Sequence, residues 1–259
     1  MTENKPILVE RKDHIGVITL NRPGQMNTFT VEFAGQLNDA LVSLDADDDI
    51  RVVVVQGAGR AFSVGIELDC FKNRTHDEYR ELIRQMDAHN HTIARMKKPV
   101  MASVGGYAVA NGAGLVFACD LAVAAESAKF GTTAVNVGLI CLGPAVPMAR
   151  SIGRKKTLEM VLSGDMITAA EAERLGLINR VVPDDALEAE TMAWAEKLAQ
   201  KSPLSLRAGK TGIYGMSDLP YHQALDYLGE IFAALCATED AQEGLSAFEE
   251  KRKPVWKLR

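Results

Sequence analysis

The sequence predicts an α/β fold in which a core of alternating strands and helices is followed by a helical C-terminal region. Strand and helix patterns alternate along the first half of the chain, whereas apolar residues at helical spacing dominate the second half. The length of 259 residues allows one large domain that needs no disulfide or metal to hold its core. We therefore predict an α/β core over residues 1–200 and a helical region over residues 201–259.

The first predicted elements are a hairpin, a helix and a buried strand. Residues 7–20 hold two apolar runs around a polar turn, which is typical of a β-hairpin. After a break at residues 21–24, Thr30 is expected to cap a helix. Residues 51–56 form an uninterrupted, largely β-branched run, which favours a central strand covered on both faces. The apolar positions of the predicted helix are Phe33, Leu37, Ala40, Leu41 and Leu44.

The remaining core elements follow from the same patterns. A long amphipathic helix is predicted over residues 78–96, and strands over 99–104 and 121–125 with a short apolar helix at 112–119 between them. After Phe130 the sequence is expected to be helical throughout. The predicted helices there are 168–176, 188–201, 204–215, 221–236 and 238–251.

Composition and the cysteines exclude several classes of protein. The net charge of −5 argues against a nucleic-acid-binding protein, which usually carries a basic face. The cysteines form no C-x-x-C pair and read as free thiols in a reducing compartment, and the histidines show no metal-binding pattern, so no metal is expected. The four cysteines are Cys70, Cys119, Cys141 and Cys236.

Targeting and membrane segments are not expected either. The polar N-terminus lacks the apolar core of a signal peptide, which favours a cytoplasmic location. Residues 101–125 are apolar enough to suggest a membrane span. However, several glycines, Asn111 and Asp120 interrupt this stretch, so we interpret it as the buried centre of the α/β core.

Two glycine-containing junctions between strand and helix, residues 57–69 and 105–115, are the candidate sites. Neither matches a P-loop or a dinucleotide-binding fingerprint. Glycine lets the backbone approach a ligand closely, and a helix N-terminus leaves N–H groups without partners. Two such N–H groups converging on a carbonyl oxygen would form an oxyanion hole suited to a thioester enolate. For either junction alone, a tight turn that only packs strand on helix is the better interpretation.

A set of eight motifs in fixed order carries a family resemblance. On these motifs the sequence resembles the crotonase (enoyl-CoA hydratase/isomerase) superfamily over essentially its whole length. Residues 136–141 together with the tail 251–256 resemble the branch named enoyl-CoA hydratase domain-containing protein three most. The motifs are residues 18–23, 57–65, 98–102, 106–108, 118–122, 162–172, 176–183 and 243–254.

The resemblance implies a fold, a ligand and an assembly. It implies a crotonase-like ββα spiral core, here residues 1–200, with a helical C-terminal trimerisation region, here 201–259, and trimers that pair into hexamers. It also implies an acyl-CoA thioester as the bound substrate, with coenzyme A as part of that substrate and no separate cofactor. Partners other than acyl-CoA and further copies of the chain, such as nucleic acid or a membrane, are not expected.

Carried over position by position, the resemblance marks two backbone amides as the oxyanion hole, those of Ile66 and Asn111. Asn111 stands where the family usually has glycine. Since the donor is a backbone N–H and asparagine accepts left-handed conformations, we expect the hole to be intact. The resemblance also marks residues that would line the CoA or its pantetheine arm, namely Arg60, Ala61, Ser63, Ile66, Glu67, Leu68 and Asp69.

The acid/base positions of the family are empty in this sequence. Enoyl-CoA hydration uses a carboxylate pair, and the matching positions hold Gly114 and Ala134. A third position, where related isomerases and dehalogenases carry an aspartate, holds Leu142. Weak or absent hydration of crotonyl-CoA is therefore expected. The candidate substitutes are Glu67, Asp69 and Cys141, and the candidate cations for the CoA phosphates are Arg60, Lys72 and residues 251–253.

Three functions remain open from the sequence. The first is a hydratase or double-bond isomerase with a non-standard base. The second is an acyl-CoA-binding protein without catalysis. The third is a thioester hydrolase or decarboxylase that relies on the oxyanion hole.

Overall fold

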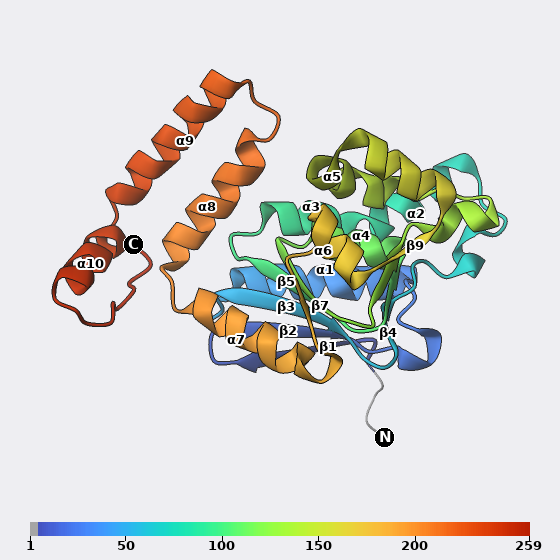
Figure 1. Ribbon diagram of the computed structural model, residues 1–259, viewed down its shortest axis with the longest axis horizontal. Helices are drawn as coiled ribbons and strands as arrows, with labels where there is room; N and C mark the ends of the chain where they lie inside the picture. Colours follow the sequence, from blue (N-terminus) through green and yellow to red (C-terminus); the bar gives the residue numbers. More distant parts are fainter. Residues whose placement is uncertain (1–4) are drawn as a thin grey trace.

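The computed structural model, which describes residues 5–259, confirms the α/β fold and contains two sheets (Figure 1). The larger sheet has six strands in the order β1-β2-β3-β5-β7-β10. Only β1 and β2 are antiparallel, as the predicted hairpin requires, and the other neighbours are parallel. The strands are β1 (Ile7–Lys12), β2 (Ile15–Leu20), β3 (Val52–Gly57), β5 (Val100–Val104), β7 (Leu121–Ala125) and β10 (Arg180–Val182).

The smaller sheet has four short strands in the order β4-β6-β8-β9. β4, β6 and β8 each follow a strand of the larger sheet and precede helices, so a ββα unit is repeated three times along the chain. This repetition confirms the ββα spiral. The strands are β4 (Ala61–Ser63), β6 (Tyr107–Val109), β8 (Lys129–Gly131) and β9 (Met166–Thr168).

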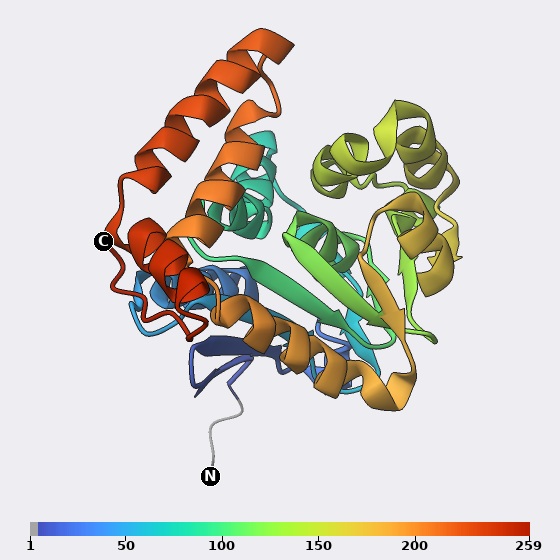
Figure 2. The same cartoon turned by 60° about the vertical axis from the view of Figure 1, so that its left-hand side comes forward.

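Helices cover both faces of the larger sheet (Figure 2). Val53 and Val55 of β3 face the main core with α1, whereas Val52 and Val54 face a second core with α7. The prediction of a strand covered on both faces is therefore confirmed. Thr30 caps α1 as predicted, since its Oγ1 accepts from the Phe33 amide at 3.2 Å.

The helices span most of the remaining chain. They are α1 (Val31–Ala46), α2 (His76–Met86), α3 (Ala88–Arg95), α4 (Asn111–Ala118), α5 (Leu142–Ser163), α6 (Ala169–Leu175), α7 (Leu187–Ala199), α8 (Pro203–Met216), α9 (Tyr221–Cys236) and α10 (Glu239–Glu249). Short 3-10 turns are η1 (Pro23–Gln25), η2 (Leu68–Phe71), η3 (Thr133–Val137) and η4 (Asp184–Ala186).

Two sequence predictions about these elements are wrong. The helix predicted over residues 78–96 is two helices, α2 and α3, that meet at Asp87. The chain after Phe130 is not helical throughout, because it also contains β9 and β10. These strands have three residues each, and neighbouring strands rather than their own sequence pattern hold them in place.

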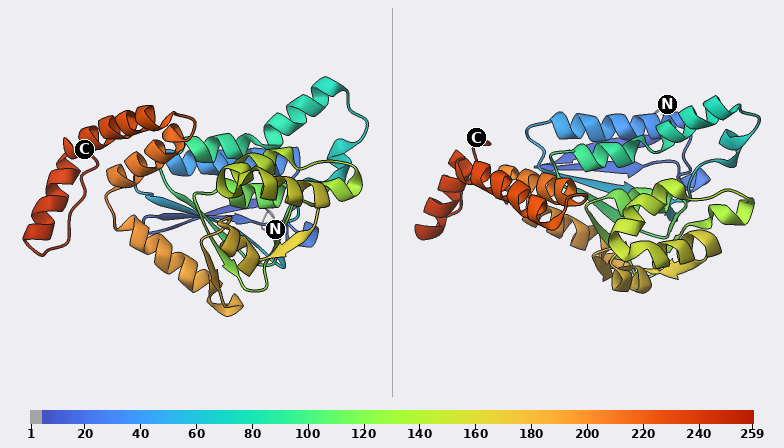
Figure 3. Two further views of the ribbon diagram at one scale, coloured as in Figure 1. Left: turned by 45° about the horizontal axis from the view of Figure 1, so that its top comes forward. Right: turned by 90° about the horizontal axis from the view of Figure 1, so that it is seen from above.

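The C-terminal helices α8, α9 and α10 extend away from the sheets (Figures 1 and 3). α8 packs on α9, where Gly212 leaves room for the Leu228 side chain. The predicted boundary between residues 200 and 201 falls between α7 and α8 and stays a prediction as a domain boundary. Across residues 5–259, no helix combines the length and apolar character that a membrane span requires.

Candidate active site

The first glycine junction presents the Ile66 amide on a loop that follows β4. Gly65 has φ +96°, a conformation that favours glycine. Its carbonyl accepts from the Phe29 amide at 2.8 Å, and the Glu67 amide donates to the Phe29 carbonyl at 3.0 Å. The backbone on both sides of Ile66 is thereby fixed, while the Ile66 amide itself has no acceptor within residues 5–259.

The second junction presents the Asn111 amide in the first turn of α4. First-turn N–H groups have no acceptor within their own helix, and the Asn111 amide has none elsewhere in the described chain. Ala110 precedes it with φ 49° and ψ −123°, a strained conformation for a residue with a side chain. The Asn111 side chain is buried and donates through Nδ2 to the Met86 carbonyl at 3.2 Å.

The two junctions are in direct contact. A Cβ placed on Gly65 would lie 2.7 Å from the Ala110 Cβ and 3.3 Å from the Asn111 nitrogen. A Cβ on Gly112 would lie 2.2 Å from the Ser63 carbonyl oxygen. The glycines therefore allow the loop after β4 and the start of α4 to touch, which brings two unpartnered amides into one small region. The sequence alone does not reveal this contact, because the two glycine junctions are far apart along the chain.

Glu67 is engaged in an ion pair beside the first loop. Its Oε1 accepts from Arg22 Nη2 at 2.7 Å and from Thr28 Oγ1 at 3.0 Å. Arg22 also donates to the Thr28 carbonyl at 2.6 Å. These bonds brace the loop that carries Ile66 and argue against a free catalytic base at Glu67.

The other predicted lining residues divide into exposed and buried sets. Asp69 is exposed and pairs with Lys72, whose ammonium lowers the pKa of the Asp69 carboxyl. Arg60 and Leu68 are exposed as well. Ala61 and Ser63 are buried, and Ser63 Oγ donates to the Asn27 carbonyl at 2.8 Å, so their side chains support the loop rather than face a ligand.

The three positions at which the resemblance places acid/base groups differ in their surroundings. A Cβ on Gly114 would lie 2.8 Å from Pro144 Cγ, so the first turn of α5 fills the space that a glutamate would enter. Ala134 is half-buried in η3, and Leu142 is exposed at the start of α5. Cys141 is buried, and burial raises the pKa of its thiol, which makes it a poor nucleophile or base.

The basic tail does not join this site within one chain. Residues 251–253 follow α10, at the opposite end of the molecule from β4 (Figure 1). Arg252 pairs with Glu243 and Glu250 at 2.5 and 2.6 Å. No group of three metal-ligating side chains occurs among residues 5–259.

Sequence reasoning missed two titratable residues beside the second junction, Asp87 and His89. His89 is buried, and burial lowers the pKa of its imidazole to about 4, so the ring is neutral. Asp87 occupies the break between α2 and α3, and burial raises the pKa of its carboxyl. Because a continuous helix was predicted over 78–96, no break was expected at Asp87. In the sequence, only the polar composition of residues 87–91 indicates the break.

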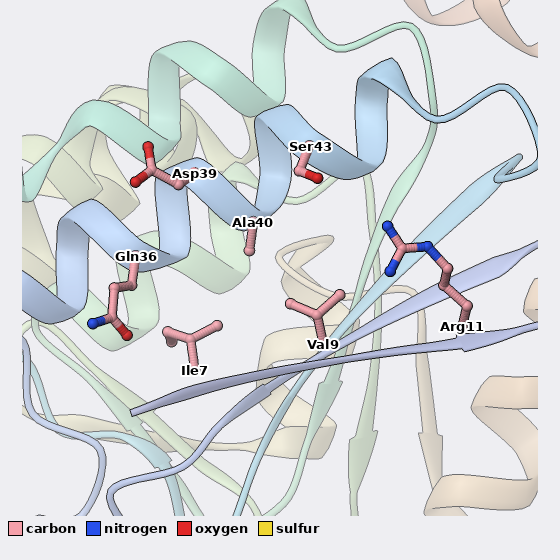
Figure 4. A pocket seen from close by; sticks show the side chains of 7 residues that line it. All are labelled: Ile7, Val9, Arg11, Gln36, Asp39, Ala40 and Ser43. Atoms are coloured by element: carbon pink, nitrogen blue, oxygen red, sulfur yellow. The ribbon is translucent and has the colours of Figure 1, made fainter. Parts of the chain in front are cut away.

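The described chain contains a large cavity beside the second junction and a smaller hollow elsewhere. A cavity of about 830 Å³ lies between α3, α5 and α8, and Asp87, Asn90 and His91 form part of its wall. Its volume is within the range of small-molecule sites. A smaller hollow of about 320 Å³ lies between β1 and α1 and contains none of the predicted site residues; it is lined by Ile7, Val9, Arg11, Gln36, Asp39, Ala40 and Ser43 (Figure 4).

Comparisons with known proteins agree with this architecture. The family model described as enoyl-CoA hydratase/isomerase matches residues 10–259. A Mycobacterium tuberculosis protein named probable enoyl-CoA hydratase is 34% identical over 249 residues, 96% of each chain. The mouse protein named enoyl-CoA hydratase domain-containing protein 3, mitochondrial, is 34% identical over 98% of this chain and 86% of its own length.

Solved structures extend the same likeness to three dimensions. The crystal structure of a Mycobacterium smegmatis enoyl-CoA hydratase superposes with a TM-score of 0.94 at 35% identity, covering 97% of this chain and 99% of that one. Human enoyl-CoA hydratase domain-containing protein 3 superposes with a TM-score of 0.94 at 34% identity, covering 97% and 100%. The chain belongs to the enoyl-CoA hydratase/isomerase family.

Proposed function

We propose that the protein binds acyl-CoA thioesters with the thioester carbonyl oxygen between the Ile66 and Asn111 amides. The observation that carries this proposal is the contact between the two glycine junctions, each of which ends in an N–H group without an acceptor within residues 5–259. Such donors stabilise the negative charge that develops on the oxygen as a thioester becomes an enolate. Membership of the family supports an acyl-CoA substrate.

The site supports enolate chemistry better than water addition. Hydration of an enoyl-CoA through a carboxylate pair would need groups that Gly114 and Ala134 do not supply, and Pro144 closes the space at Gly114. We therefore propose weak hydratase activity. A thioester-binding protein without turnover is the second candidate, and the same closure at Gly114 favours it.

Other expectations remain predictions. A cytoplasmic location stays a prediction, and several relatives are named mitochondrial. We likewise propose assembly into trimers or hexamers.

A comparison of two ligands tests the role of the amides without changing the protein. Butyryl-CoA and S-butyl-CoA differ by the carbonyl oxygen alone, which the thioether lacks. Two hydrogen bonds of about 1 kcal/mol each predict that the thioether binds about tenfold or more weakly in calorimetry. The carbonyl stretch of butyryl-CoA should also move to lower frequency on binding.

Asn111→Gly is the matched control variant, because it keeps the backbone N–H and removes only the side chain. It should preserve the preference for the thioester. Equal affinities of wild-type protein for the two ligands would contradict the oxyanion hole, and no affinity for either would contradict acyl-CoA binding itself.

A further inference from the structure

Asp87 is a carboxylate without a partner at the junction of α2 and α3. Its side chain is half-buried, and it makes no hydrogen bond or ion pair within residues 5–259. Burial of a carboxylate is unfavourable unless other groups compensate for the lost water. Such a group in a cavity wall is therefore a candidate for function.

The first turn of α5 places Asp87 next to one of the empty acid/base positions. A Cβ on Gly143 would lie 2.5 Å from Asp87 Oδ1 and 2.8 Å from Oδ2, so the carboxylate rests directly on Gly143. Gly143 follows Leu142, the third of those positions. The N-terminal turn of a helix also favours a negative charge beside it.

α4 places Asp87 next to the other empty position and the second free amide. The Asn111 side chain donates to the carbonyl of Met86, the residue before Asp87. Gly114 lies one turn after Asn111 on the same face of α4, and it packs on Pro144, the neighbour of Gly143. The α2–α3 junction and the start of α5 therefore meet the face of α4 on which the family places a catalytic glutamate.

We infer that Asp87 is the acid/base group of this site and moves a proton at the α-carbon of the bound acyl-CoA. This inference rests on the proposed function, since the thioester must sit on the Ile66 and Asn111 amides. The α C–H bond breaks, the proton passes to an Asp87 carboxylate oxygen, and the electron pair moves to the thioester oxygen as an enolate. Return of a proton from Asp87 to the same carbon regenerates the thioester.

The surroundings of Asp87 suit this role. Burial raises the pKa of the carboxyl, which makes it a stronger base than an exposed aspartate, and the nearby His91 opposes this rise. Asp87 and His91 both line the cavity between α3, α5 and α8, which offers the carboxylate a route to exchange its proton with water.

Proton exchange on a saturated thioester tests Asp87 without knowledge of the natural reaction. Wild-type protein in D₂O should incorporate deuterium at the α-carbon of butyryl-CoA, which mass spectrometry or NMR detects. Asp87→Asn should lower the exchange rate by about 100-fold or more, the usual contribution of a positioned acid or base. Its affinity for butyryl-CoA in calorimetry should change by less than about threefold, since the oxyanion amides are intact.

Two further variants separate chemistry from folding. Asp77→Asn removes an exposed carboxylate of α2 and should leave exchange unchanged. Gly143→Ala places a methyl group against the Asp87 carboxylate and should also lower exchange while the protein binds butyryl-CoA. Asp87→Glu should restore part of the activity that Asp87→Asn loses.

The outcomes distinguish this inference from the proposed function. If the protein binds butyryl-CoA but exchange is absent in wild type, or unchanged in Asp87→Asn, Asp87 is not the acid/base group. If neither wild type nor the variants bind butyryl-CoA, the proposed function fails and this inference fails with it.

Discussion

At the scale of single residues, backbone conformation around the two free amides carries the clearest mark of a functional site. Gly65 adopts a positive φ at little cost, but Ala110 holds φ 49° with ψ −123°, which costs of order 1–3 kcal/mol. Contacts with Gly65 and the start of α4 keep Ala110 in place. Strain that surrounding packing maintains next to an unpartnered N–H is typical of sites arranged for a ligand.

Three acidic residues show why residue type alone does not identify a catalyst. Glu67 and Asp69 follow the first amide in sequence, yet Glu67 is held by Arg22 and Asp69 is exposed beside Lys72. Asp87 lies far from either glycine junction in the sequence and is the half-buried acid without a partner. Their different roles depend on contacts between distant segments.

An unpaired, half-buried carboxylate also makes a prediction about stability. Because the pKa of Asp87 is raised in the folded protein, the folded state binds its proton more tightly than the unfolded state. This contribution to stability falls as the pH rises from the ordinary value of 3.8 through the folded pKa. Asp87→Asn should therefore stabilise the protein at pH 7 by about 1 kcal/mol, which raises Tm by about 2–4 °C.

Thermal unfolding of the wild type and Asp87→Asn at several pH values measures this effect. The difference in Tm should shrink as the pH falls through the folded pKa and below 3.8, where the Asp87 carboxyl becomes protonated in both states. If the variant is less stable than wild type at pH 7, the negative charge of Asp87 stabilises the folded state. The expected result, more stability with less proton exchange, is the usual trade-off at an active site.

At the scale of secondary-structure elements, long amphipathic or β-branched segments could be predicted and short ones could not. α1 has its cap and its apolar face within one segment, so the sequence was sufficient to predict it. β4, β6, β8 and β9 have three residues each, and pairing with one another defines them. The break between α2 and α3 was missed because the apolar spacing of 78–96 continues across Asp87.

The same limit applied to the site. The resemblance marked Ile66 and Asn111 from local motifs, and both amides are free of acceptors in the described chain. Asp87 could not be found this way, because its relation to Gly114 and Leu142 depends on the packing of α4 against the first turn of α5.

Packing between α4 and α5 predicts different responses at Gly114 and Ala134, the two positions at which the resemblance expects glutamate. Gly114→Glu forces a side chain into Pro144 and should destabilise the protein by about 1–3 kcal/mol, the usual cost of overpacking. Ala134→Glu lies at a half-buried position and should cost less. Chemical denaturation of the two single variants checks this difference. Equal losses of unfolding free energy would show that α5 can move to make room for the new side chain at position 114. Restoring a catalytic pair through both substitutions is therefore expected to require a change at Pro144.

At the scale of the whole molecule, the outer part of the C-terminal arm (α8, α9 and α10, residues 203–249) exposes a large apolar face, although Lys210 of α8 pairs with Asp120 at 2.7 Å. α9 has no buried residue although apolar side chains recur along it. Leu228 packs on α8, but Leu225 and Phe232 remain 53% and 66% exposed, and Phe248 of α10 is 84% exposed. Large aromatic side chains at such exposure on neighbouring helices favour association with other protein surfaces.

We therefore predict that the native particle is a trimer or hexamer whose contacts include the outer face of α9. Sedimentation of the wild type at micromolar concentration should give a mass that is a multiple of 28.1 kDa. Phe232→Asp places a charge in the apolar face and should shift the particle toward smaller species, because burying an unpaired charge in an interface is strongly unfavourable. Gln223→Asp adds the same charge at an exposed polar position of α9 and should leave the mass unchanged. A 28.1 kDa wild-type monomer would show that the exposed apolar face of α9 is not an oligomer interface.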